Sequence, residues 1–115
     1  MSVHEYSIIQ ALFARIEEEA RRREARAVTR VRVSIGELSG VETELLATAY
    51  RTFRERTICQ EAPLEILAVP ARWACPRCER EIPKGQVLRC PDCDLSARLT
   101  EGEEIVLERI EMEVA

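Results

Sequence analysis

Two pairs of cysteines constrain this chain more than any other feature of its sequence. Two residues separate the members of each pair, and eleven residues lie between the pairs. Each spacing allows one tight turn to aim two sulfur atoms at the same ion, and two such turns complete a tetrahedral shell. A closed shell leaves no position for a substrate. The pattern therefore predicts a structural metal site formed by Cys75, Cys78, Cys90 and Cys93.

Zinc is the metal that this pattern favours, because Zn²⁺ has no geometric preference of its own and is commonly held by four thiolates. Four soft sulfur ligands also accept iron, and paired thiols can serve redox chemistry, so these remain alternatives. Residues 71–100 contain few apolar side chains, and we expect a bound metal to order them. Pro83, Lys84 and Gly85 predict a hairpin turn between the two cysteine pairs.

Length and composition limit the classes of protein that this chain can belong to. With 115 residues, 46% of them hydrophobic, it can form one main core and a small satellite. No segment approaches the roughly 18 apolar residues of a membrane helix, and the first residues lack the layout of a secretory signal. We therefore expect a cytoplasmic protein that does not contact membranes. The net charge of −4 argues against nucleic-acid binding.

The segments outside the cysteine pairs predict two helices and three strands. Helical spacing of apolar residues indicates a first helix from His4 to about Arg26. Its apolar face comprises Ile8, Ile9, Leu12, Phe13, Ile16 and Ala20. Alternating apolar residues predict strands over Val31–Ile35, Leu64–Ala68 and Ile105–Val114, and the last alternation slips at Glu108–Arg109, which indicates a bulge.

The second helix is predicted from a capping box, with Ser39 as the N-cap residue and Glu42 three residues later. This helix is expected to bury Leu45, Leu46, Ala49, Tyr50 and Phe53. Cys59 is expected to be a small buried residue at its end. The resulting prediction is an α+β fold in which two helices cover a three-stranded sheet, with a small zinc-ribbon-like module of two CxxC knuckles.

His4 is the only histidine of the chain and lies close to its first residue. A lone histidine is usually a surface or capping residue. Near a chain terminus, however, an imidazole and deprotonated backbone amides can bind square-planar Ni²⁺ or Cu²⁺ together. If Met1 is removed, Ser2-Val3-His4 offers an amine, two amides and an imidazole. Ser2 and Glu5 also fit a capping box for the first helix, so both interpretations stay open.

Three sets of residues together resemble the HypA family: His4-Glu5-Tyr6-Ser7, the segment Ile35–Glu42, and the two CxxC pairs. The resemblance implies a nickel metallochaperone that delivers Ni²⁺ during maturation of [NiFe]-hydrogenase, with urease as a further possible client. It implies no enzymatic activity. It also implies a HypB-type GTPase and the hydrogenase large-subunit precursor as partners, and a monomer or weak homodimer.

The resemblance also assigns metals to the two parts of the chain. It implies weakly bound nickel at His4, at Glu5 through its backbone amide, and at Glu42, with structural zinc in the cysteine module. Residues 1–70 and 101–115 would then form the nickel-binding α/β domain, and residues 71–100 a zinc-binding module inserted between the last two strands. Family members usually begin Met-His-Glu, whereas Ser2-Val3 precedes the histidine here.

Other functional classes compete with nickel delivery. A zinc-ribbon module for protein or nucleic-acid interaction, without nickel function, is the main alternative. A metal or thiol enzyme is disfavoured, because the sequence has one histidine, no nucleophile elbow and no phosphate-binding glycine loop. An iron electron-transfer protein would be recognised by its colour.

Overall fold

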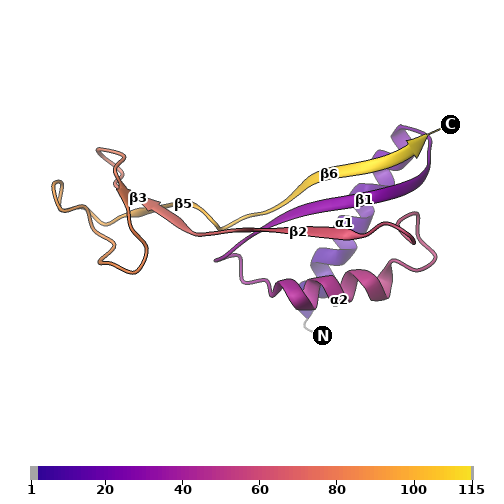
Figure 1. Ribbon diagram of the computed structural model, residues 1–115, viewed down its shortest axis with the longest axis horizontal. Coiled ribbons are helices and arrows are strands. Elements are labelled where there is room, and N and C mark those ends of the chain that lie inside the picture. The colour runs from indigo at the N-terminus through magenta and orange to yellow at the C-terminus, as the bar shows by residue number, and fades with distance from the viewer. Residues whose placement is uncertain (1–2, 115) are drawn as a thin grey trace.

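The protein is described by a computed structural model that covers residues 3–114, with side chains from Glu5 onward. A helix–sheet unit (residues 3–69 and 105–114) contains α1 (Val3–Arg22), β1 (Ala25–Gly36), α2 (Thr43–Phe53), β2 (Leu64–Val69) and β6 (Ile105–Val114). A cysteine module (residues 72–101) contains β3 (Arg72–Ala74), β4 (Glu81–Ile82) and β5 (Arg98–Glu101). The molecule measures 57 × 31 × 17 Å, and the module projects from one end (Figure 1). The predicted α+β class, with two helices and a three-stranded sheet, is confirmed.

The main sheet has the strand order β2-β1-β6, with β1 parallel to β2 and antiparallel to β6. Its register shifts where Arg32 pairs with Arg109 but the next residue, Val33, pairs with Leu107. Glu108 is therefore an extra residue, and the bulge predicted from the slipped alternation is confirmed. In a regular strand, residues three positions apart face opposite sides of the sheet. The extra residue lets Leu107 and Ile110 face the same side.

The core lies between the sheet and the two helices. Apolar residues of α1, α2 and β1 form one buried cluster, in which Ile16, Val31 and Leu46 have no exposed surface. The ring of Tyr50 stacks on that of Phe13, with centroids 5.5 Å apart. The predicted apolar face of α1 therefore packs as expected, and this packing fixes α1 and α2 against one face of the sheet.

The first helix ends earlier than predicted. α1 ends at Arg22, not near Arg26, and β1 already begins at Ala25. Glu24 has a left-handed backbone (φ 52°), and its N–H donates to the carbonyl of Arg21 at 3.1 Å. This turn terminates the helix. The residues after it join the sheet because the end of β6 is available to pair with them.

The predicted capping box of the second helix is wrong. Ser39 Oγ accepts a hydrogen bond from the N–H of Val41 at 3.3 Å, which closes a local turn. The N-cap residue of α2 is Glu42, whose side chain makes no capping hydrogen bond. The helix thus begins three residues later than predicted. Leu45 and Phe53, expected in the core, are 36% and 39% exposed.

The helices of residues 3–114 include none that combines the length and the apolar character needed to cross a membrane. The longest, α1, has 20 residues and carries charged side chains along its outer face.

Candidate metal centres

The cysteine module brings together the four thiols that the sequence predicts as ligands. Their sulfur atoms all lie within 4.8 Å of one another. The Sγ atoms of Cys78 and Cys90 are 3.8 Å apart. A tetrahedral Zn²⁺ site with Zn–S bonds of about 2.3 Å has edges of about 3.8 Å. The donor set and its spacing therefore fit one ion held by four sulfur atoms.

Each cysteine pair lies in the same kind of turn. The N–H of Glu79 donates to the carbonyl of Cys75 at 3.0 Å, and the N–H of Asp94 donates to that of Cys90 at 2.9 Å. Glu79 and Asp94, each four residues after the first cysteine of its pair, have φ values of 62° and 54°. The repeated sequence spacing thus folds into a repeated backbone geometry. This repeat aims both pairs of sulfur atoms at a common point.

Backbone amides and neighbouring thiols control the charge on the sulfur atoms. The N–H groups of Cys78 and Arg77 point at the sulfur of Cys75 and lower its pKa to about 6. Burial, together with the surrounding thiols, raises the pKa of Cys93 to about 12. A cation held among the four sulfur atoms would favour their thiolate forms.

Little apolar packing supports the module apart from the cysteines. Its buried cluster consists of Cys75, Ile82 and Cys90, with Trp73 and Leu95 partly buried against it. Short pairings of β3 with β4 and with β5 form its sheet. This small core agrees with the expectation that a metal ion orders the segment.

The predicted nickel ligands at the start of the chain are only partly described. The His4 imidazole lies outside the described residues, so its role stays a prediction. The side chain of Glu5, in the first turn of α1, is buried with 3% exposed surface. The ring of Tyr6 contacts that of Phe53 edge-on, with centroids 5.1 Å apart. The start of α1 is thereby fixed against the last residue of α2.

Glu42 lies at the other end of α2. Within residues 3–114 its exposed carboxylate makes no hydrogen bond or ion pair, so the predicted capping role does not compete with metal binding. Glu42 lines an open pocket of about 620 Å³ together with Glu37 and Glu44. The ring of Tyr6, near the start of α1, contacts Phe53, which is the last residue of α2. A ligand role for Glu42 stays a prediction.

A carboxylate that the sequence did not single out connects the two parts of the molecule. Glu37 Oε1 accepts a hydrogen bond from the N–H of Ala71 at 2.9 Å, and Oε2 forms an ion pair with Lys84 in the turn after β4, where no strand pairs across the predicted hairpin turn. The Lys84 ammonium and the Ala71 amide lower the pKa of Glu37 below its ordinary value. Glu37 and Lys84 are 47 residues apart. No local pattern could have predicted this pairing.

Backbones cross closely beside this contact. A Cβ at Gly36 would lie 2.3 Å from the carbonyl carbon of Gly102, and one at Gly102 would lie 2.6 Å from the Cα of Ala71. The loop that leads to α2 therefore packs directly on the two chain segments that enter and leave the module.

Comparison with known proteins supports the resemblance seen in the sequence. Residues 3–112 match the family described as hydrogenase/urease nickel incorporation, metallochaperone, hypA. The chain belongs to the HypA family. It is 40% identical to the hydrogenase maturation factor HypA of Aquifex aeolicus, over 97% of this chain and 99% of that protein. The corresponding factor of Shewanella oneidensis is also 40% identical, over 98% of each chain.

Two solved HypA structures share the fold. The solution structure of a HypA protein superposes with a TM-score of 0.79 and 33% identity, over 97% of this chain and 98% of that chain. The solution structure of the nickel metallochaperone HypA from Helicobacter pylori superposes with a TM-score of 0.71 and 31% identity, over 96% and 98%. The likeness to HypA thus extends over both the helix–sheet unit and the cysteine module.

Proposed function

We propose that this chain is a nickel metallochaperone that supplies Ni²⁺ for the maturation of [NiFe]-hydrogenase, with urease as a further client. The observation that carries this proposal is the family match over residues 3–112, which spans both parts of the molecule. Relatives named hydrogenase maturation factors, which align over nearly their whole length, support the hydrogenase assignment.

In this proposal the two metals are separated by ligand type. Zn²⁺ is held by Cys75, Cys78, Cys90 and Cys93 in a closed sulfur shell, which suits a permanent structural ion. Ni²⁺ is held at the start of the chain by the imidazole of His4 and the backbone amide of Glu5. A site near a terminus exchanges its ion readily, and delivery requires such exchange. The nickel domain is then residues 1–70 and 101–115, and the zinc module residues 71–100.

Ser2 and Val3 precede His4 in this chain, whereas family members usually begin Met-His-Glu. The proposed nickel site therefore differs in the donors that the first residues can supply. With Met1 removed, Ser2-Val3-His4 supplies four nitrogen donors in sequence, a set that suits square-planar Ni²⁺. Mass spectrometry of the protein purified from its native cells measures this directly. An intact Met1 would contradict the four-nitrogen arrangement.

The proposed partners follow from the family role. We infer transfer of nickel to or from a HypB-type GTPase and to the precursor of the hydrogenase large subunit, in the cytoplasm. The chain itself acts as a carrier and not as a catalyst. Isothermal titration of the zinc-loaded protein with each purified partner tests this inference, and no detectable association in the presence of Ni²⁺ would contradict it.

Nickel titration of variants tests the proposed ligands. His4→Ala should abolish stoichiometric nickel binding, while the zinc content and the circular dichroism spectrum stay those of the unmodified protein. Unchanged nickel binding would refute the assignment of His4.

Glu42 has a matched control, because Glu44 is also exposed and lines the same pocket. Glu42→Gln should weaken nickel binding more than Glu44→Gln does if Glu42 is a ligand. Equal effects of the two substitutions would remove Glu42 from the site.

A further inference from the structure

The outer edge of β6 borders a groove that the proposed nickel site does not use. Among the described residues, β6 pairs with β1 and its other side pairs with no strand. From Arg109 to Val114 the strand runs without a proline and without an extra residue. The outward N–H and C=O groups of such an edge can pair with a further strand. β6 therefore offers an edge on which an extended segment can add to the sheet.

The pairing of β1 shows which backbone groups face this edge. The N–H of Val31 donates to the carbonyl of Pro63 at 3.1 Å, on the side of β2, and Val31 lies opposite Ile110. When one member of an antiparallel pair turns its backbone groups away from the other, the second does so as well, and successive residues alternate. The N–H and C=O groups of Ile110 and Met112 therefore face the free edge.

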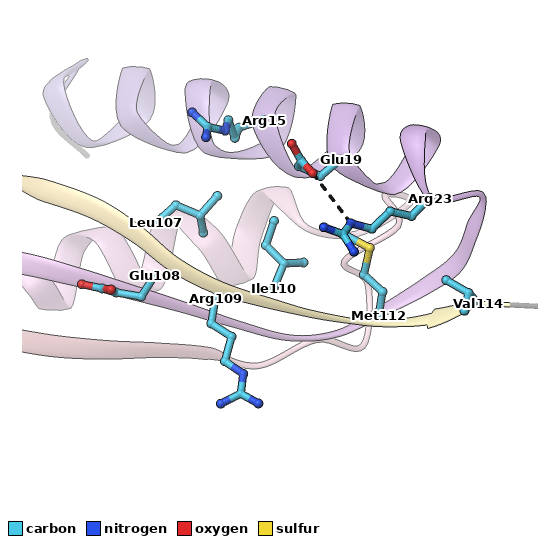
Figure 2. A pocket seen from close by; sticks show the side chains of 9 residues that line it. All are labelled: Arg15, Glu19, Arg23, Leu107, Glu108, Arg109, Ile110, Met112 and Val114. Atoms are coloured by element: carbon cyan, nitrogen blue, oxygen red, sulfur yellow. Dashed lines mark ion pairs between the residues drawn. The ribbon is translucent and has the colours of Figure 1, made fainter.

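The side chains of the same two residues line the groove. It lies between β6 and α1 and has a volume of about 550 Å³. Figure 2 shows Leu107, Ile110 and Met112 pointing toward α1, whereas Arg109 points to the other face of the sheet. All three apolar side chains are partly buried against the core. Residues that lie opposite each other on neighbouring strands share a face, so an added strand would place every second side chain in this apolar groove.

The charges of the groove leave one cation without a partner. Four of its five charged residues have one: Glu19 with Arg23 at 3.8 Å, Glu108 with Ser34 at 2.8 Å, and Arg109 with Glu111 at 3.6 Å. The fifth, Arg15, is exposed, and its guanidinium makes no ion pair or hydrogen bond with the residues that the structure describes. A cation left over beside an apolar groove favours an occupant that carries a carboxylate.

We propose that β6 accepts an extended segment of a partner protein as a fourth strand, with apolar side chains opposite Ile110 and Met112 and a carboxylate at Arg15. Main-chain hydrogen bonds supply affinity in such an arrangement, and the groove selects alternate side chains. The added strand runs antiparallel to β6, the slightly more stable direction of pairing. Figure 2 shows Arg15 over the Leu107 end of the groove, so the acidic residue follows the apolar ones along the segment.

A second copy of this chain fits the groove less well than an acidic segment does. Its β6 would offer apolar side chains to the groove, but its Glu111 lies on the other face of the sheet, beside Arg109. Its α1 would approach on the same face as the first and would bring the same arginines. Arg15 would then meet no carboxylate, so charge complementarity favours the partner segment.

A short capped peptide of alternating threonine and valine, with its last valine replaced by glutamate, serves as the probe. Added to the zinc-loaded full chain, it should shift the amide NMR signals of Ile110 and Met112, with a dissociation constant below about 1 mM. N-methylation of the valines should raise that constant at least roughly 10-fold, because antiparallel pairing directs their N–H groups at β6. N-methylation of the threonines, whose N–H groups point away from β6, should leave it unchanged.

Charge reversal at Arg15 tests the position of the carboxylate. Arg15→Glu should weaken binding of the glutamate peptide roughly 3- to 10-fold, and a peptide with lysine in place of glutamate should bind this variant better than it binds the unmodified protein. Arg21→Glu is the matched control, because Arg21 lies on the same helix, is also exposed and lines a different pocket. It should leave both dissociation constants unchanged. Circular dichroism and zinc content verify that both variants fold.

Four outcomes would overturn the proposal. They are absence of amide shifts at about 1 mM peptide, equal effects of the two N-methylated peptides, equal weakening by Arg15→Glu and Arg21→Glu, and protection of the β6 amides that rises with protein concentration without peptide. The last would assign the edge to a second copy. His4 lies eleven residues before Arg15, about 16 Å along the helix, and His4→Ala should bind the peptide normally. Failure of the nickel assignment is thus distinguishable from failure of this one.

Discussion

The helix–sheet unit and the cysteine module hold their folds by different means. In the unit, twelve buried residues from two helices, a strand and a connecting loop form one apolar cluster. In the module the buried cluster has three residues, and two of them are cysteines. Removing apolar surface from water therefore stabilises the unit, whereas the small core of the module implies that an ion held by its four cysteines would be needed to order it. Two parts of one short chain thus respond to different perturbations.

Removal of the metal should have the largest effect and should be confined to the module. Structural zinc sites contribute about 10 kcal/mol or more of apparent binding free energy, which the module's small core cannot replace. Treatment with a strong chelator should collapse the amide chemical-shift dispersion of residues 72–101 in heteronuclear NMR spectra. Residues of β1 and β6 should keep theirs. Loss of both sets of signals together would show that the two regions fold as one.

A cavity in the helix–sheet unit should lower the stability of the fold and leave metal binding by the cysteine module unchanged. Ile16 has no exposed surface, and Ile16→Ala should lower the free energy of unfolding by about 2–5 kcal/mol. Zinc affinity of the folded protein should not change. Val87, which is 79% exposed in the module, supplies the control, since Val87→Ala should shift neither quantity measurably. Urea unfolding monitored by circular dichroism gives the first quantity, and competition with a chromophoric chelator gives the second.

A substitution where the two regions meet should affect both. Gly102 has φ 98°, and a Cβ there would lie 2.6 Å from the Cα of Ala71. Gly40 has a similar φ of 82° with no atom within 4 Å of an added Cβ. Gly40→Ala should therefore cost about 1 kcal/mol of left-handed strain, and Gly102→Ala about 1–3 kcal/mol more for the backbone overlap. Thermal unfolding of the two variants measures the difference, and equal losses would argue against close packing at the junction.

The smallest effect should come from the contact between Glu37 and the module. Lys84 and the Ala71 amide hold the pKa of Glu37 below its ordinary value of 4.5. A lowered pKa in the folded state means that the contact stabilises the protein above pH 4.5 and that this stabilisation is lost as the pH falls further. Glu37→Gln should remove that pH dependence and speed hydrogen exchange of the Ala71 amide at neutral pH. A wild-type exchange rate in the variant would contradict the role of this carboxylate.

Local patterns predicted those features whose cause is local. The repeated CxxC spacing predicted four sulfur atoms at one point, and the slipped alternation at Glu108 and Arg109 predicted the bulge in β6. The same reasoning failed for α2. Ser39 and Glu42 have the spacing of a capping box, but Ser39 closes an earlier turn and Glu42 takes the N-cap position. A short polar side chain can satisfy several nearby amides, so the spacing alone did not select one.

The sequence by itself determined the chemistry of this protein: four thiols at metal-binding spacing, one histidine near the first residue, and the order of helices and strands. Each depends on residue type and short-range periodicity, which are fixed before the chain folds. Only the tertiary structure decided that Glu37 reaches Lys84 and that β1 extends back to Ala25. These features join residues distant in sequence, and their position follows from how the helices and the bulged sheet pack together.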